Sequence, residues 1–326
     1  MTLLSIQSFL DKIGVEEVLQ RVNDLAIIHY AVPVMIGLVF VEMLLGVITN
    51  RQQYTGKDLL SSIMIGIGNL ITSAMTKTFM FTTVLICIYL SPFRIEASWW
   101  SFILCLILSD FARYWAHRVA HEQRIWWATH VPHHSSTNYN FSVSFRLSWV
   151  QQVKILFFIP VALMGFDPVM FFIVHQIEVL YQYWIHTEFI RKFPKPIEFI
   201  FTTPSHHRVH HATNKNYIDK NYGSTFIIWD RMFGTFQPEE EQAVYGITKP
   251  IKTMNPFFLV FHEFMDIARD FRRARTLKQK MKVIFGNPND QKFLESLDEP
   301  EEKEAPLGGS LNPITANPSR NEAPTE

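Results

Sequence analysis

The sequence predicts an all-α integral membrane protein with about three spans, a membrane-inserted helical hairpin and a histidine-rich helical domain. Of the 326 residues, 48% are hydrophobic and only 18% are charged, whereas a soluble protein usually carries about 25% charged residues. Several apolar runs approach or exceed the roughly 20 residues that cross a bilayer as a helix. Eight of the histidines fall into three short clusters, all of them after the third apolar run.

The first part of the chain holds the predicted spans. Residues 1–25 have apolar side chains at helical spacing and are expected to form an interfacial helix. Residues 26–48 form the first predicted span. Residues 59–90 form a long second span, tilted or broken, in which Lys77 either snorkels or faces protein. Residues 101–115 form the third span, which leads directly into the first histidine cluster.

The second part alternates polar segments with a hairpin. Residues 149–164 and 168–184 are apolar but short for full spans, so they are expected to enter the membrane and return as a helical hairpin. Residues 256–285 are expected to form one amphipathic helix with a basic run at 269–282. The acidic tail, 289–326, has few apolar residues and is expected to be disordered.

Residues 26–288 are thus expected to form one multi-pass membrane domain that contains the histidine clusters at 117–134 and 206–211. Basic residues next to spans prefer the cytoplasmic side. Arg51 and Lys57 in the first loop, together with the basic run, therefore predict a cytoplasmic location for all the clusters.

Charge and cysteine content exclude some functions. The chain has 30 basic and 30 acidic residues, so it lacks the basic excess that binding to nucleic acid requires. Its two cysteines, Cys87 and Cys105, lie inside apolar runs and fit neither a disulfide framework nor a zinc motif.

The three clusters have the spacing of metal ligands. Neutral imidazole is the commonest protein ligand for transition metals. One cluster reads H-x-x-x-H and two read H-x-x-H-H, which is enough nitrogen for two metal ions. The clustered residues are His117, His121, His130, His133, His134, His207, His210 and His211.

The spacing also predicts how the ligands divide. His117 and His121 lie one turn apart on a helix and can bind one ion together. Pro132 forces a turn inside the second cluster. The adjacent residues His133 and His134 can then point to different ions, and the same holds for the adjacent pair in the third cluster. Two ions held in this way keep open positions for dioxygen.

Further polar residues are candidates near the metals. His186 stands at the polar end of the hairpin and is the candidate for a ninth metal ligand, with His175, eleven residues earlier, a weaker one. His206 is either a ligand or a group that orients His207.

One carboxylate is a catalytic candidate. Glu122 follows His121, but the segment is not H-E-x-x-H, so a zinc peptidase is excluded. Asp110, Asp219 and Asp230 could orient the ligands.

The order H-x-x-x-H, H-x-x-H-H, H-x-x-H-H after paired spans resembles the fatty acid hydroxylase/sterol desaturase superfamily over about residues 95–240. Within it, the segments HHSS with YN (133–140), HHRVHH (206–211), IDKNYG (218–223) and IIWDR (227–231) are most similar to the alkylglycerol monooxygenase family. The resemblance implies two non-haem iron ions held by the eight clustered histidines, with tetrahydrobiopterin as reductant.

The expected function is therefore a di-iron oxygenase that uses O2 to hydroxylate or desaturate a lipid C–H bond, with ether-lipid cleavage the leading reaction. Its expected partners are a membrane lipid, dioxygen and an unidentified electron donor. A sterol desaturase and a fatty acyl hydroxylase are alternatives within the superfamily. A membrane metal carrier or sensor is an alternative of another class, although transport favours ionisable groups inside several spans.

Overall fold

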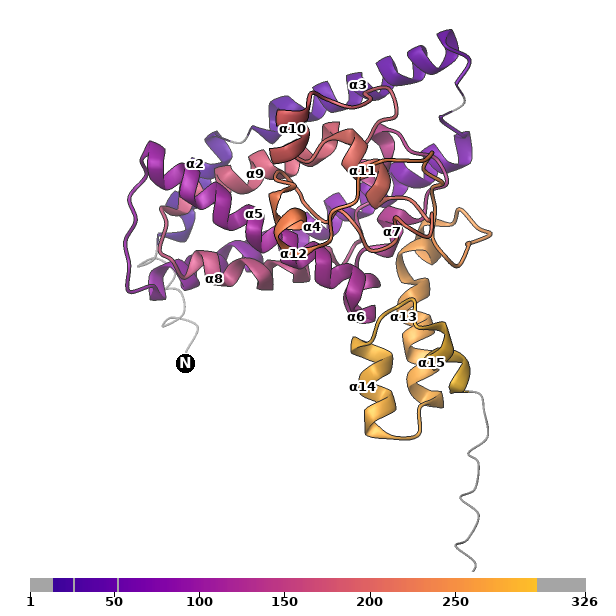
Figure 1. Cartoon of the computed structure of the whole chain (residues 1–326). Helices are drawn as coiled ribbons and strands as arrows, with labels where there is room; N and C mark the ends of the chain where they lie inside the picture. Colours follow the sequence, from indigo (N-terminus) through magenta and orange to yellow (C-terminus); the bar gives the residue numbers. More distant parts are fainter. Residues whose placement is uncertain (1–13, 26, 52, 298–326) are drawn as a thin grey trace, which may run out of the picture.

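The computed structural model describes residues 14–25, 27–51 and 53–297, and in these residues it has helices but no β-sheet (Figure 1). The all-α class is confirmed. The elements are α2 (Val15–Asp24), α3 (Ile28–Ile48), α4 (Gly56–Leu90), α5 (Trp99–Glu122), α6 (Arg124–Trp127), α7 (Val131–His134), η1 (Phe141–Phe145), η2 (Gln151–Phe158), α8 (Ile159–Ala162), α9 (Pro168–Trp184), α10 (Lys195–Ile200), α11 (Pro204–His210), α12 (Ile228–Phe233), α13 (Pro256–Arg273), α14 (Leu277–Phe285) and α15 (Gln291–Ser296).

In the part of the chain that the structure describes, two helices are long and apolar enough to cross a membrane, and they coincide with the first two predicted spans. These are α3, with 21 residues, and α4, with 35. Many of their large apolar side chains face outward: Leu70 is 70% exposed and Met75 is 79% exposed. A surface of this kind suits lipid rather than water.

The predicted third span and hairpin form a packed helical layer beside α4. The core between them contains Val84 of α4, Cys105 of α5 and Val174 of α9. The first arm of the hairpin is the 3-10 segment η2 followed by the short helix α8, not one α-helix. Gly165 makes the turn at φ 78°, where an added Cβ would lie 2.2 Å from a backbone oxygen.

The N-terminal helix packs on this layer. Val15 and Val22 of α2 contact Phe81 and Val169. Asn23, at the end of the same helix, accepts a hydrogen bond of 2.8 Å from the Lys77 ammonium. Lys77 therefore faces protein, which is one of its two expected positions. Residues 1–13 of the predicted interfacial helix lie outside the described residues.

The prediction of a single helix over 256–285 is wrong. The chain leaves α13 at Ala274, which has ψ 124°, and α14 starts anew. Thr276 caps α14 by accepting a hydrogen bond from the Gln279 backbone N–H, and the Gln279 side chain completes the capping box. The sequence prediction overlooked this helix start, because the apolar residues keep their helical spacing across it. A capping box can begin a new helix without a Gly or Pro.

The expected disorder from residue 289 is corrected in part. Residues 291–296 form α15, and Phe293, Leu294 and Leu297 pack into a cluster with Ile267 and Val283. Three apolar side chains within five residues are enough to attach this short segment. Residues 298–326 of the predicted tail lie outside the described residues.

Truncation distinguishes the two parts of the tail. Removing residues 298–326 is expected to leave the melting temperature of the protein in detergent unchanged. Removing residues 289–326 takes away the buried Leu297 and its two apolar neighbours, and each buried apolar side chain contributes about 1.5–3 kcal/mol. The shorter protein should therefore melt several degrees lower. Equal melting temperatures for the two truncations would show that α15 contributes no stability.

Candidate metal centre

Nine histidines converge into two adjoining groups that each could hold a metal ion. Within each group the nitrogens that could bind an ion all lie within 4.8 Å of one another. The first group is His117, His121, His130, His134 and His210. The second group is His133, His186, His207 and His211.

The helices that present these side chains follow from the sequence. Because α5 continues unbroken to Glu122, His117 and His121 lie on one face with ring centroids 5.3 Å apart. The short helix α7 begins with Pro132 in its first turn and carries the second cluster. The third cluster lies on α11 and its C-cap, and His186 follows the end of α9.

Adjacent histidines point to different groups, as their spacing predicts. His134 and His210 belong to the first group, whereas their neighbours His133 and His211 belong to the second. The His134 and His211 rings stack across the boundary, with centroids 4.3 Å apart. The two groups are therefore neighbours in one site.

Backbone carbonyl groups orient several of the rings. The Nδ1 atoms of His117, His186 and His210 lie 2.8, 2.7 and 3.0 Å from the carbonyl oxygens of Tyr222, Gln182 and Lys220. A carbonyl can only accept, so Nδ1 carries the proton and donates it. Each Nε2 atom is then left with a free lone pair, which is the arrangement typical of metal-binding histidine.

Burial keeps the imidazoles neutral. Removal from water lowers the pKa of all nine histidines below the ordinary value, and it lowers the pKa of His186 to about 4. Two nitrogens of the first group, Nε2 of His121 and Nε2 of His210, are buried without a hydrogen-bond partner. Buried polar atoms are nearly always satisfied, so these two are available to a cation.

Two buried carboxylates hold the loop that orients His117. Asp230 accepts hydrogen bonds from the backbone N–H groups of Tyr222 and Gly223, at 2.8 and 2.7 Å. Asp110 accepts from the backbone of Thr225 and from the indole N–H of Trp229. Both carboxylates therefore fix the backbone whose carbonyl receives the His117 proton.

A buried ion pair supports the second cluster. The Arg146 guanidinium is fully buried, lies 2.5 Å from the Asp58 carboxylate and donates to the Ser135 hydroxyl at 2.8 Å. The Ser136 hydroxyl donates to the other Asp58 oxygen at 2.8 Å. Because Ser135 follows His134 directly, this network fixes the end of α7 to the start of α4.

Glu122 and Asp219 differ in their relation to the histidines. The Glu122 carboxylate pairs with Arg118 at 2.9 Å, is 39% exposed, and forms no hydrogen bond to a histidine among the described residues. Asp219 has an oxygen 3.8 Å from Nδ1 of His121 and adopts a positive φ of 59°. Asp219 is thus the carboxylate that faces the first group.

His206 and His175 lie outside both groups. Nδ1 of His206 accepts from the Thr203 backbone N–H at the start of α11, and its Nε2 donates to Glu198 at 3.0 Å. His206 therefore orients the helix that carries His207, which is one of its two expected roles. Nδ1 of His175 accepts from Arg113 at 3.0 Å.

Sequence reasoning missed Lys154. Its ammonium lies 3.3 Å from Nδ1 of His130 in the first group. The sequence could have indicated a role for this residue, because it is a single lysine inside an apolar run of the predicted hairpin. A lysine in a membrane is costly unless it has a functional or structural partner.

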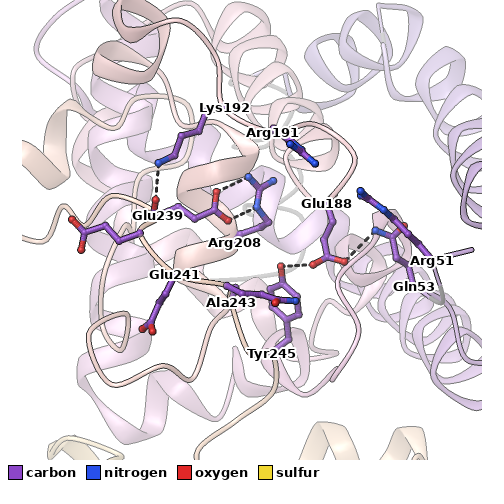
Figure 2. A pocket seen from close by; sticks show the side chains of 12 residues that line it. Arg51, Gln53, Glu188, Arg191, Lys192, Arg208, Glu239, Glu241, Ala243 and Tyr245 are labelled. Carbon is purple, nitrogen blue, oxygen red and sulfur yellow. Dashed lines mark hydrogen bonds and ion pairs between the residues drawn. The ribbon is translucent and has the colours of Figure 1, made fainter. Parts of the chain in front are cut away.

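A polar pocket of about 770 Å³, whose lining residues are drawn in Figure 2, opens near the segment that carries the second group. Its lining includes Glu188 and Tyr245, whose hydroxyl donates to Glu188 at 3.0 Å. The Tyr245 ring stacks on Tyr139 at 4.8 Å, and Tyr139 in turn lies 5.2 Å from the His211 ring. Two aromatic rings therefore separate the pocket from the second group.

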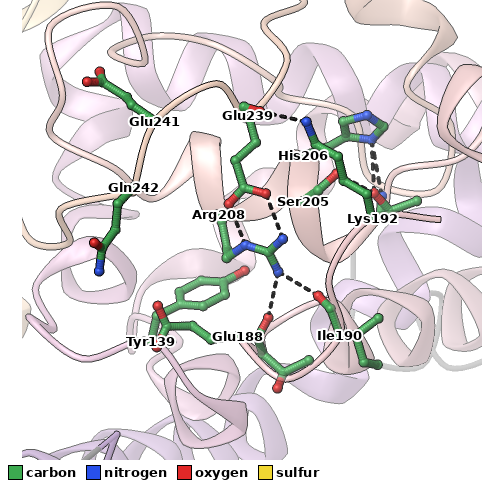
Figure 3. A network of polar contacts seen from close by, with 12 residues as sticks. Tyr139, Glu188, Ile190, Lys192, Ser205, His206, Arg208, Glu239, Glu241 and Gln242 are labelled. Carbon is green, nitrogen blue, oxygen red and sulfur yellow. Dashed lines mark hydrogen bonds and ion pairs between the residues drawn. The ribbon is translucent and has the colours of Figure 1, made fainter. Parts of the chain in front are cut away.

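The pocket wall is rigid where it meets α11. Arg208, the neighbour of His207, donates two hydrogen bonds to Glu239, at 2.6 and 2.7 Å, and a further one to the Ile190 carbonyl (Figure 3). By contrast, the buried carbonyl oxygen of the Gln53 side chain, also in the lining, has no hydrogen-bond partner.

Comparison with known proteins matches residues 102–235 to the fatty acid hydroxylase family. The chain is 38% identical to human alkylglycerol monooxygenase over 280 residues, which cover 83% of this chain and 61% of the human protein. It is 44% identical to the Xenopus tropicalis alkylglycerol monooxygenase over 198 residues, 60% of this chain and 44% of that protein. The chain thus spans less than two thirds of the length of these relatives.

More distant similarity extends to an ornithine lipid hydroxylase, OlsE, of Rhizobium tropici. The two are 31% identical over 150 residues, which cover 45% of each protein. No solved structure matches the chain.

Removing one partner of the buried ion pair is expected to destabilise the protein strongly. Asp58→Ala leaves the buried Arg146 charge without compensation, which costs about 3–5 kcal/mol. Asp266→Ala, which removes one of the two carboxylate partners of the exposed Arg269, should change the stability by less than about 1 kcal/mol. Chemical unfolding in detergent measures both. A loss for Asp58→Ala no larger than for the surface variant would contradict the role given to this network.

Proposed function

We propose that this chain, which carries a fatty acid hydroxylase domain over residues 102–235 and is homologous to alkylglycerol monooxygenases, is a membrane-bound lipid monooxygenase with a non-haem di-iron centre. The observation that carries the proposal is the convergence of nine buried, neutral histidines into two adjoining groups. Imidazole nitrogen is a ligand that suits iron.

The donor set fits two cations. The first group offers five nitrogens and the second offers four, and the Nε2 atoms of His121 and His210 are buried without a hydrogen-bond partner. Bound there, ferrous iron supplies the reduction of dioxygen and the oxidation of an unactivated C–H bond. The protein holds the rings through the backbone carbonyls of Tyr222, Gln182 and Lys220 and keeps water away by burying them.

The carboxylates have supporting roles in this proposal. Asp219 faces Nδ1 of His121 and stabilises the protonated form of that nitrogen, which leaves Nε2 for the metal. Glu122 adds negative charge near His121 and is fixed by Arg118. Its proposed role is therefore positioning, in place of the direct catalytic role that its sequence position suggests.

An ether lipid of the alkylglycerol type is the proposed substrate. The alkylglycerol monooxygenases are 38–44% identical to this chain, compared with 31% for the ornithine lipid hydroxylase and 29% for a rat methylsterol monooxygenase. One oxygen atom of O2 would enter the C–H bond beside the ether oxygen, and the other would leave as water with two electrons and two protons from a reductant. The resulting hemiacetal breaks its C–O bond to give a fatty aldehyde and a glycerol.

The polar pocket is the proposed route for the reductant. It is open, lies on the far side of the Tyr245–Tyr139 stack from the second group, and offers the Glu188 carboxylate as an acceptor for N–H groups. These features suit a small, water-soluble two-electron donor, and tetrahydrobiopterin is the proposed one.

The proposed topology places the histidines in the cytoplasm. Arg51 lines the pocket and lies three residues after the end of α3. Because basic residues next to spans prefer the cytoplasmic side, the pocket and the site behind it would open there. The fixed, hydrogen-bonded rings favour a stationary centre over the alternative of a metal carrier.

The reaction is tested with membranes that contain the protein. With an alkylglycerol, oxygen and tetrahydrobiopterin, we expect fatty aldehyde to form. His207→Ala should abolish it, whereas His262→Ala, on α13 and outside both groups, should retain most of the activity. If no aldehyde forms, yet a sterol or acyl chain is hydroxylated or desaturated with a protein electron donor, the ether-lipid assignment is wrong.

A further inference from the structure

The helix α14 presents an apolar stripe outward. Leu277, Met281 and Phe285 are 75%, 49% and 47% exposed and recur every four residues, so they share one face. Lys278 is exposed beside this stripe, whereas Lys282 pairs with Asp290 at 2.9 Å and its ammonium lies 4.2 Å from the Phe293 ring centroid. A helix on the surface of a water-soluble protein turns its apolar side chains toward the core. The helix α14 has apolar side chains on its core face and, in addition, a second apolar stripe that faces away from the core.

The opposite face of α14 is already packed. Val283 is fully buried in the cluster that contains Ala128, Ile267 and Leu297. The exposed stripe is therefore an additional apolar surface and not a core face without a core.

Packing on α4 places this helical unit beside a candidate membrane span. Leu259 and Val260 of α13 pack against Ile65 of α4, and the Trp149 indole donates to the Ile65 carbonyl at 2.9 Å. Ile65 lies about 13 Å along α4 from its start, at 1.5 Å per residue. In Figure 1, α13, α14 and α15 project from the bundle across the direction of α3, as a unit lying along a membrane surface would.

We propose that α14 lies in the headgroup region of the membrane that α3 and α4 cross, with its apolar stripe among the acyl chains and Lys278 on anionic phospholipids. An apolar stripe with a free lysine beside it is the pattern of an interfacial helix. The Lys278 ammonium decides the kind of lipid, because the cytoplasmic leaflet carries negative charge. This anchor is separate from the proposed oxygenase activity and depends only on the insertion of the chain in a membrane.

The anchor also contacts the segment that enters the metal centre. The backbone N–H of Arg124 donates to the Gly286 carbonyl at the end of α14 at 2.9 Å, and its side chain pairs with Glu263 and Asp270 of α13 at 2.6 and 2.8 Å. Arg124 opens α6, which carries Trp127, and the Trp127 ring lies 5.1 Å from the His121 ring. Lipid contact at α14 therefore supports the position of the first group.

The test uses the full chain in nanodiscs, with an environment-sensitive fluorophore on a single cysteine. Met281→Cys reports on the stripe, and Glu295→Cys, exposed on α15 of the same unit, is the control. Both are made with Cys87→Ala and Cys105→Ala, which remove the native thiols. We expect the label at 281, but not at 295, to shift to the blue and to be quenched by doxyl-labelled acyl chains when phosphatidylserine is mixed with phosphatidylcholine.

Charge and occupant are tested in the same system. Replacing Lys278 by glutamine should reduce the quenching at 281 in the anionic nanodiscs several-fold. Equal quenching in pure phosphatidylcholine would overturn the anionic part of the proposal. A solvent-exposed label at 281 in both lipids would overturn all of it. A protected label that becomes exposed when residues 298–326 are removed would also overturn it, because the tail would then be the occupant.

Discussion

The structure depends on the burial of nine imidazoles as neutral groups in two adjoining volumes. Their nitrogens lie within 4.8 Å of one another in each group, where several positive charges would repel strongly. Burial prevents protonation, and hydrogen bonds from Nδ1 to backbone carbonyls decide which nitrogen stays free. Asp110 and Asp230 hold the loop that carries the Tyr222 carbonyl in a fixed position.

Buried carboxylates attach the candidate spans to the histidine segments. Glu42 of α3 accepts hydrogen bonds from the Thr187 hydroxyl and from the Phe141 backbone N–H, and Thr187 follows His186. Asp58 of α4 pairs with Arg146 and accepts from Ser136, two residues after His134. Each of the two candidate spans thus contacts a residue one or two positions after a histidine of one group, so that the candidate metal centre and these two helices form one structure.

The sequence predicted those parts of the site that local geometry decides. The H-x-x-x-H pair lies on one face of α5, because a helix has 3.6 residues per turn. Each adjacent pair divides between the two groups, because consecutive side chains on a turn or helix point in different directions. His186 was found from its place at the polar end of α9. Its approach to His133, at 3.1 Å, depends on tertiary packing, and the sequence could only suggest it.

The remaining features depend on contacts that sequence patterns do not encode. His206 stands next to the ligand candidate His207 in the sequence. Its ring nevertheless points away from both histidine groups, because it accepts a hydrogen bond from the Thr203 backbone at the start of α11. Glu122 pairs with Arg118, four residues earlier, where the sequence suggested a role beside His121. The break between α13 and α14 rests on one threonine cap, and Lys154 reaches His130 only because the hairpin packs beside α5.

The central claim is that the two groups each hold one iron ion, and metal analysis of purified protein tests it most directly. The account predicts about two iron ions per chain, about one in His121→Ala with the second group intact, and about one in His207→Ala with the first group intact. A single ion per chain that both variants lose together, or two ions that both variants retain, would contradict it.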